Sequence, residues 1–183
     1  ASDVYKRQLQ NRSEGTVRAL LGKELMTENG LLTEQGSSTF WDRSTLYALR
    51  GIYIAGQADR ATEFLSHYAR RRLLGDHVPY PIEAWPEGSQ RHLAAESGLF
   101  CRVITEGLFG IRPTGFRSFD LTPSMPSGWN RMLLRHIRAF ENNFDLVIEK
   151  QPDGFLRVTL AISGCNPRAF RLRQGASLRI KLP

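Results

Sequence analysis

Residues 42–75 read DRSTLYALRGIYIAGQADRATEFLSHYARRRLLG, and this stretch decides the fold. In residues 42–55 apolar side chains lie nearly all the way round a helix, which is typical of a helix covered on most sides. In residues 59–75 they recur at intervals of three and four with charged residues between them, so one face of that helix is exposed to solvent. Only about three residues separate the two helices, which predicts that they are antiparallel neighbours.

The flanking sequence extends this pattern. A first helix is expected over residues 14–25, and a helix over residues 92–109 is again apolar almost throughout. The segment 76–90 contains three prolines and cannot be a regular helix. Because helices 42–55 and 92–109 run in the same direction, the long loops that precede them should meet at one end. The alternation of amphipathic and fully apolar helices is typical of an α/α barrel.

After Pro113 the hydrophobic period changes from 3.6 to 2. The expected strands cover residues 117–121, 132–140, 144–150, 155–162 and 169–182. Residues 151–154 (QPDG) suit a hairpin turn, and Gln174-Gly175 is expected to turn a final hairpin. The predicted fold class is α+β, a partial α/α barrel followed by a small antiparallel β-sandwich. The predicted divisions are an unstructured segment 1–12, a barrel part 13–112 and a β-sandwich 113–183.

The net charge of +7 and the pI near 9.9 raise the question of nucleic acid. The basic residues are spread along the chain, and the one tight cluster, residues 70–72, would fan around a helix end, where cations complement the helix dipole. No zinc-finger, helix-turn-helix or RNA-binding pattern accompanies the charge. No apolar run reaches the ~20 residues that a membrane span needs. We therefore expect neither a nucleic-acid nor a membrane partner.

The two cysteines, Cys101 and Cys165, are far apart in the sequence. Cys101 lies within an apolar helical run, which predicts a buried free thiol. No residues have metal-ligand spacing, so we expect no metal and no cofactor. Residues 2–8 resemble translated sequencing-adapter DNA, and on that basis the first residues are expected to carry no function.

The side chains that suit carbohydrate chemistry gather in the two long loops. Aromatic faces stack on sugar rings, amides and charged groups bond hydroxyls, and paired carboxylates supply an acid and a base. The second loop, residues 79–92, holds this mixture at a helix entrance, and the first loop adds three residues at the same end. The candidate catalytic residues are Glu87 and Glu83, and the candidate substrate-binding residues are Trp41, Asp42, Arg43, Trp85, Gln90 and His92.

Each candidate also has a structural interpretation. Asp42 suits a helix N-cap, Glu83 and Glu87 suit solvated or loop-pinning charges, and Trp85 between prolines suits packing. His92 is more often structural than catalytic. Two further carboxylates lie in the apolar helix: one turn inside its start, Glu96 could reach the barrel lumen, and Glu106 is expected to be a buried partner of an arginine such as Arg102.

Four segments carry a resemblance to a known family. Residues 39–50 (TFWDRSTLYALR), 78–93 (VPYPIEAWPEGSQRHL) and 105–111 (TEGLFGI) resemble the late hairpins of six-hairpin glycosidases, which include α-rhamnosidase-like hydrolases and maltose-phosphorylase-like enzymes. Residues 121–129 (LTPSMPSGW) are similar to the segment by which such enzymes enter a C-terminal β-sandwich. The resemblance extends from about residue 39 to the end of the chain.

The resemblance implies a bacterial glycoside hydrolase that cleaves an oligosaccharide or plant-type glycan by acid–base catalysis, usually with inversion. It favours Glu87 as general base or substrate ligand, with Glu83 second, and a general acid from an earlier hairpin. It also implies a periplasmic or secreted location. The alternatives are a phosphorylase on the same barrel and a non-enzymatic basic binding module.

Size gives a separate reason to expect a C-terminal fragment. Six hairpins need twelve helices of ~11–12 residues plus loops, which is more than this chain offers. The missing partner would be an N-terminal part of the same chain. Without it, we expect the chain to be inactive and its inner helices to expose apolar surface.

Overall fold

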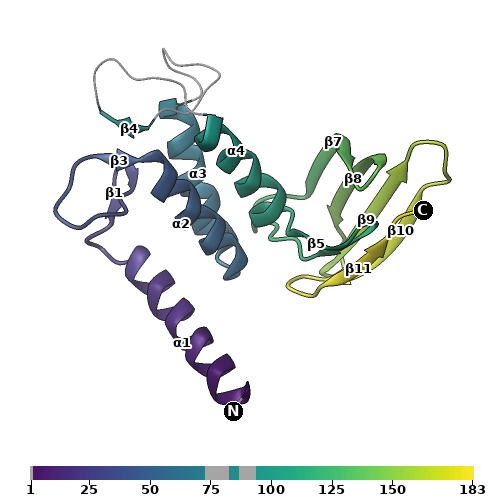
Figure 1. Cartoon of the computed structure of the whole chain (residues 1–183), viewed down its shortest axis with the longest axis horizontal. Helices are drawn as coiled ribbons and strands as arrows, with labels where there is room; N and C mark the ends of the chain where they lie inside the picture. Colours follow the sequence, from purple (N-terminus) through teal and green to yellow (C-terminus); the bar gives the residue numbers. More distant parts are fainter. Residues whose placement is uncertain (1, 73–82, 87–93) are drawn as a thin grey trace. The chain divides into compact units, whose positions relative to one another are not determined.

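The computed structural model describes residues 2–72, 83–86 and 94–183 (Figure 1). The chain divides into two compact units, Ala1–Gly107 and Leu108–Pro183, where the sequence suggested a boundary at 112/113. The fold class is mixed α+β, with four α-helices and several antiparallel sheets among the described residues. The described helices do not close into a barrel.

The helices α2 (Asp42–Ile54) and α3 (Ala58–Arg72) pack side by side as an antiparallel pair. The turn between them uses Gly56 at a φ of 79°, a conformation that favours glycine. The backbone N–H of Gln57 donates to the carbonyl of Ile52 at 3.1 Å, which closes the end of α2. The short antiparallel connection predicted from the sequence is confirmed.

A third helix, α4 (Ala94–Arg102), continues directly into a π-helical turn, η1 (Val103–Leu108). Two ion pairs join this helical run to α2. Arg43 in the first turn of α2 bonds Glu96 near the start of α4, and farther along Arg50 bonds Glu106. Because partners follow in the same order along both helices, α2 and α4 run in the same direction, as predicted.

Two sequence-based expectations about the helices are wrong, and a third agrees with the structure. The first helix, α1, runs Ser2–Leu20, so residues 2–12 are helical instead of unstructured; Lys, Arg, Gln and Leu in this segment favour a helix without any apolar pattern. On α2, Tyr47 and Ile54 are 50% and 49% exposed, which agrees with the expectation that the inner helices of this chain expose apolar surface. Cys101 is exposed, because the covered side of α4 carries Glu96 and Leu99.

Four short strands lie in the loops of the first unit. β1 (Met26–Thr27) pairs with β2 (Gly30–Leu31), and β3 (Phe40–Trp41) pairs with β4 (Ala84–Trp85). The sequence treated all four as loop. A two-residue strand is too short to show an alternating pattern, so its pairing is set by tertiary contacts.

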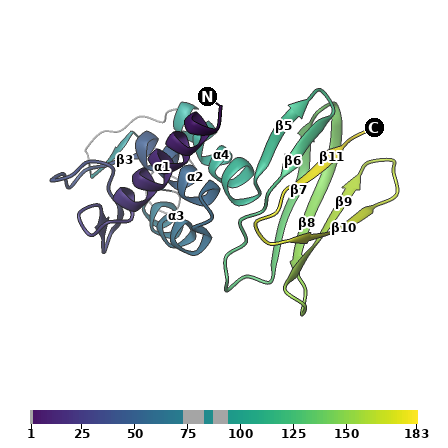
Figure 2. The same cartoon turned by 90° about the horizontal axis from the view of Figure 1, so that it is seen from below.

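The second unit consists of two antiparallel sheets (Figures 1 and 2). One has the strand order β10-β9-β8-β7 and the other the order β11-β6-β5. Phe119 joins the two sheets: it is fully buried and stacks on Phe144 of the larger sheet at 5.8 Å and on Phe140 at 5.4 Å. The strands are β5 (Ile111–Gly115), β6 (Ser118–Leu121), β7 (Arg131–Ala139), β8 (Asn142–Lys150), β9 (Phe155–Ile162), β10 (Arg168–Arg173) and β11 (Leu178–Lys181).

The turn chemistry was predicted well, and the topology less so. Gly154 has a φ of 80°, and its N–H donates to the carbonyl of Gln151 at 3.0 Å, as expected for the β8–β9 hairpin. Gly175 also turns the chain, at a φ of 78°. The strands on either side of it join different sheets, however, so the predicted final hairpin is wrong. The missed strand, β5, contains Pro113, a residue that is poorly compatible with central strands.

None of the described helices combines the length and apolar content that crossing a membrane requires.

Candidate functional site

The β3–β4 ribbon joins the two loops that the sequence singled out. Phe40 lies opposite Trp85 and Trp41 lies opposite Ala84, and the backbone N–H of Asp42 donates to the carbonyl of Glu83 at 2.8 Å. The prediction that the segments around the two tryptophans lie together is confirmed. Residues directly opposite in a ladder share a face and neighbours along a strand alternate, so the register places the two indoles on opposite faces of the ribbon.

Trp85 packs against protein side chains. Its ring lies 5.6 Å from the ring of Phe40, and the guanidinium of Arg71 sits 4.2 Å from the Phe40 centroid and 5.2 Å from that of Trp85. Gly30 makes room for Arg71, because a Cβ at that position would lie 3.1 Å from its Nη2. These contacts support the packing interpretation of Trp85, and they give Arg71 a structural task that the predicted exposed cluster did not include.

Asp42 is buried, with 1% of its surface exposed. The hydroxyl of Tyr68 on α3 donates to its Oδ2 at 3.1 Å. The N-cap of α2 is Trp41, without a side-chain cap, and Asp42 occupies the first turn, so the predicted N-cap role is wrong. A carboxylate in a first helical turn is stabilised by the helix dipole. In this position Asp42 locks α3 to the start of α2.

Arg43 connects the surface to a buried acid. Its Nε lies 2.7 Å from Oε1 of Glu96, whose side chain is completely buried while that of Arg43 is 60% exposed. Within the described parts of the chain, Oε2 of Glu96 has no hydrogen-bond partner. The pair fixes the first turns of α2 and α4 together. The exposed remainder of the Arg43 guanidinium can still donate hydrogen bonds to a ligand.

Glu106 lies farther along the same helices. Arg102 bonds it through two nitrogens, at 2.6 and 3.1 Å, and Arg50 bonds it at 2.6 Å. The hydrogen bonds from Arg102, with the charge of Arg50, hold the pKa of the Glu106 carboxyl below its usual value. The predicted partnership with Arg102 is confirmed, but at 25% exposure the carboxylate is only half-buried. It is a structural group.

The exposed end of the ribbon keeps three of the predicted groups accessible. Glu83 is exposed and Arg43 is mostly exposed. Trp41 and Trp85 are both half-buried, but of the two it is the Trp85 ring that contacts Phe40 and Arg71, which leaves Trp41 as the candidate stacking face. Such a set offers a carboxylate, an aromatic face and a cation, which are among the types of group that bind sugars. The other predicted residues, Glu87, Gln90 and His92, lie outside the described residues. Among the described residues, no group of three or more His, Cys, Asp or Glu side chains is placed to hold a metal ion.

Sequence reasoning missed the groups that fix this site. Tyr68 and Arg71 were assigned only to the apolar and charged sides of their helix, yet they hold Asp42 and Trp85. Their positions on one side of α3 became meaningful only with the β3–β4 register. Comparison of the chain with family models, with curated proteins and with solved structures found no match.

Proposed function

We propose that this chain is the late part of an α/α-barrel glycoside hydrolase with its C-terminal β-sandwich, and that the β3–β4 ribbon forms part of the glycan site. The supporting observation is the pairing of the two segments through Trp41 and Ala84. Those segments also carry the resemblance to six-hairpin glycosidases. The parallel course of α2 and α4, with α3 antiparallel, agrees with two successive hairpins of such a barrel.

In this proposal each candidate residue has one role. Trp41 stacks on a sugar ring and Arg43 donates to a hydroxyl or carboxylate, while Glu96 holds Arg43 in place. Glu87 acts as the general base on water, and Glu83 bonds the substrate. In the alternative assignment the two glutamates exchange these roles. The general acid comes from a part of the barrel outside these residues. Asp42 and Trp85, already engaged by protein partners, maintain the ribbon.

The test is glycan cleavage by the enzyme that carries this chain. A panel of plant-type oligosaccharides is incubated with the enzyme, and the anomer of the first product is followed by proton NMR. We expect hydrolysis with inversion, and the same products when phosphate is added. Release of a sugar phosphate would replace hydrolysis by phosphorolysis, and a panel without any cleavage would contradict the proposal.

Two variants test which carboxylate acts as the general base and which one binds the substrate. Glu87→Gln should lower turnover by about 100-fold or more, the low end for general acid–base catalysis. Glu83→Gln is the matched control, since it removes the same charge four residues away, and it should mainly raise the KM. Normal turnover in Glu87→Gln with a large loss in Glu83→Gln would exchange the two roles.

A further inference from the structure

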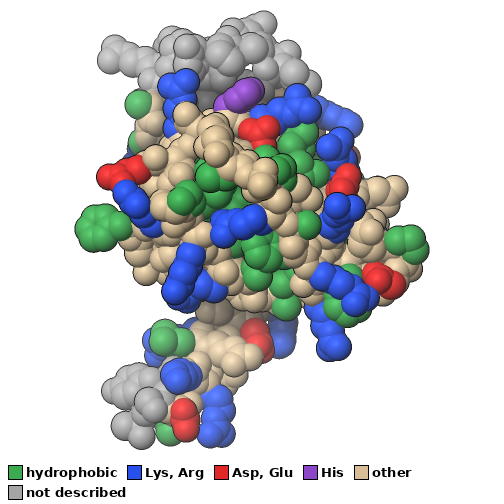
Figure 3. All heavy atoms as spheres, turned by 90° about the vertical axis from the view of Figure 1, so that its right-hand side faces the viewer, with side chains coloured by type: hydrophobic (Ala, Val, Ile, Leu, Met, Phe, Trp, Pro, Cys, Tyr) green, Lys and Arg blue, Asp and Glu red, His purple; other side chains and the backbone are tan. Residues whose placement is uncertain are grey.

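The net positive charge of the chain lies entirely in the second unit. Residues 1–107 contain 13 Lys or Arg and 13 Asp or Glu, whereas residues 108–183 contain 12 and 5. The formal charge of +7 therefore lies in the β unit, although cations are spread evenly along the sequence. Figure 3, which views the molecule from the right-hand side of Figure 1, shows Lys and Arg side chains at many places and fewer acidic ones.

The strand register gathers part of this charge on one face. Arg131 pairs with Glu149, Glu149 with Arg157, and Arg157 with Arg171, so these four residues form one row across β7, β8, β9 and β10. Their neighbours Met132, Ile148, Val158 and Leu172 are buried. Since side chains alternate along a strand, the row faces away from the core.

Two arginines on this face are not neutralised. Arg131 pairs with Glu149 at 3.3 Å and Arg171 with Asp153 at 2.7 Å. Arg157 and Arg173 are exposed and form no ion pair with any described residue. Because Arg157 lies opposite Arg171 and Arg173 is two residues farther along β10, the two are diagonal neighbours, roughly 7–8 Å apart.

The Phe155 ring contacts two arginines at the basic end of this face. The guanidinium of Arg171 lies 3.7 Å from the centroid of Phe155, and that of Arg173 lies 5.7 Å from it. Stacked guanidinium groups keep their planar forks oriented for carboxylate-like anions. The same contacts occupy the Phe155 ring, which is then unavailable as a stacking platform for nucleic-acid bases.

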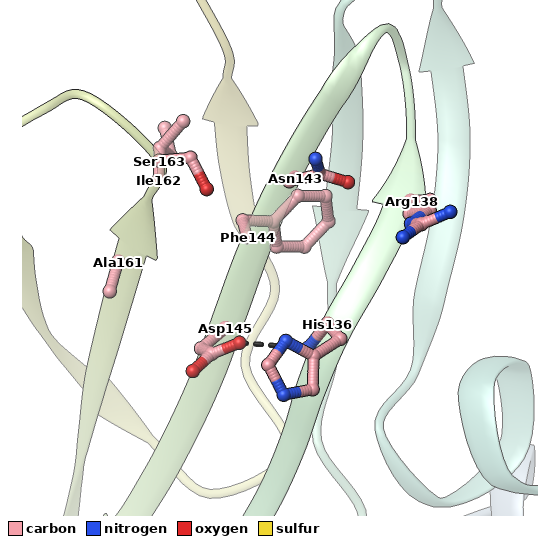
Figure 4. A pocket seen from close by; sticks show the side chains of 8 residues that line it. All are labelled: His136, Arg138, Asn143, Phe144, Asp145, Ala161, Ile162 and Ser163. Carbon is pink, nitrogen blue, oxygen red and sulfur yellow. Dashed lines mark hydrogen bonds between the residues drawn. The ribbon is translucent and has the colours of Figure 1, made fainter.

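A polar hollow of about 390 Å³ lies toward the other end of β8 (Figure 4). The side chains of His136, Asn143, Asp145 and Ser163 contribute to its lining. The bulge in β7 places His136 at a φ of 57°, and its backbone N–H donates to Oδ1 of Asp145 at 2.8 Å. Asp145 precedes Glu149 by four residues on the same face of β8, which is about 13 Å.

From these features we infer that the outward face of the β7–β10 sheet binds an anionic glycan, one that carries a carboxylate or sulfate on its sugars. The inference rests on the proposed function and specifies the class of substrate. Arg157 and Arg173 bind the anionic groups, and the hydroxyl and amide groups of the hollow bond the sugar hydroxyls.

Nucleic acid fits this face less well. Single strands are held largely by stacking of their bases on aromatic rings, and the Phe155 ring is already covered by Arg171 and Arg173. A glycan needs no base stacking, since its carboxylates or sulfates pair with guanidinium groups and its hydroxyls bond polar side chains.

The experiment measures binding of the whole chain to polygalacturonate by isothermal titration calorimetry at 0.15 M salt. The test variant is Arg157→Gln with Arg173→Gln. The control is Arg112→Gln with Lys181→Gln, which removes the same charge from the smaller sheet. We expect affinity to fall about tenfold or more in the first and to change little in the second, as for loss of two charge contacts. Circular dichroism checks that both variants fold.

Three results would overturn the inference: absence of binding by the parent chain, equal losses in both variants, or tighter binding of single-stranded DNA than of polygalacturonate. The proposed function is tested separately, by the response of the Trp41 indole signal to short oligosaccharides, neutral and acidic. A response of Trp41 without any effect of Arg157→Gln with Arg173→Gln on polygalacturonate binding would reject the anionic surface alone. Polygalacturonate binding that depends on the two arginines, with no response of Trp41 to either kind of oligosaccharide, would reject the ribbon as the glycan site.

Discussion

Removing Arg43 should unfold the helical unit at a markedly lower temperature. Its Nε lies 2.7 Å from a carboxylate with no exposed surface. At that distance the attraction is about 6 kcal/mol for an effective dielectric constant of ~20. Loss of one partner of a buried pair costs ~3–5 kcal/mol, and we expect about 3 kcal/mol because solvent reaches Arg43. Arg43→Met should then lower the Tm by roughly 10 °C.

The control asks whether the buried charge is the cause. In Arg43→Met with Glu96→Gln the carboxylate is also gone, so the double variant should recover about 2 kcal/mol relative to Arg43→Met, a coupling within the range for contacting residues. Urea denaturation followed by circular dichroism at 222 nm measures the parent, the single variants Arg43→Met and Glu96→Gln, and the double variant. The reasoning would be refuted if the stability of Arg43→Met lay within about 0.5 kcal/mol of the parent, the usual range for surface changes. It would also be refuted if the double variant were no more stable than Arg43→Met.

Three further predictions concern stability. Glu106→Gln should lower the free energy of unfolding by about 1 kcal/mol at pH 7. Because the neighbouring arginines lower the pKa of Glu106, folding favours its ionised form, and the difference from the parent should shrink as the pH falls below 4.5. Urea denaturation across pH measures this difference. Gly110→Ala should lower the free energy of unfolding by about 3 kcal/mol and Gly154→Ala by about 1 kcal/mol. Both glycines have a positive φ, but only at Gly110 would a Cβ overlap the Thr122 carbonyl. Equal decreases in Tm would contradict this prediction. Phe119→Ala should cost about 3–5 kcal/mol, seen as a lower urea midpoint, and an unchanged midpoint would exclude Phe119 from the core.

Local patterns were sufficient for the long elements of the fold. The all-round apolar residues 42–55 and the one-sided residues 59–75 correspond to α2 and α3 within a few residues. The strand expected at 155–162 has the bounds of β9. In these segments, periodicity, turn residues and length all agree, which is the condition under which sequence patterns are reliable.

The site could be predicted only as a neighbourhood. Helix directions brought the two tryptophan loops to one end, but the one-to-one register of β3 and β4 depends on contacts such as Arg71 with Phe40. That register decides which indole is packed and which carboxylate is buried. Likewise, an acid in an apolar helix could not be assigned to the lumen or to an arginine until Arg43 was placed beside Glu96.

The charge distribution shows the same limit. Counting cations along the chain gave no localisation, because their spacing is even. The face that carries Arg157 and Arg173 exists only through the pairing of β8, β9 and β10. A pattern with period 2 indicates which residues face outward, but it does not indicate which strands are neighbours.

The most direct measurement is a titration of the chain with the oligosaccharide panel, followed by the indole N–H signals of its tryptophans in ¹⁵N–¹H spectra. Trp41 and Trp85 belong to one ribbon, and Trp129 of the second unit serves as the internal reference for neutral glycans. We predict that the Trp41 signal shifts most, that the Trp85 signal, on the packed face of the ribbon, shifts less and with the same Kd, and that the Trp129 signal stays in place. A Trp85 signal that moves more than that of Trp41, or no shift with any member of the panel, would contradict a glycan site at the Trp41 face of the ribbon.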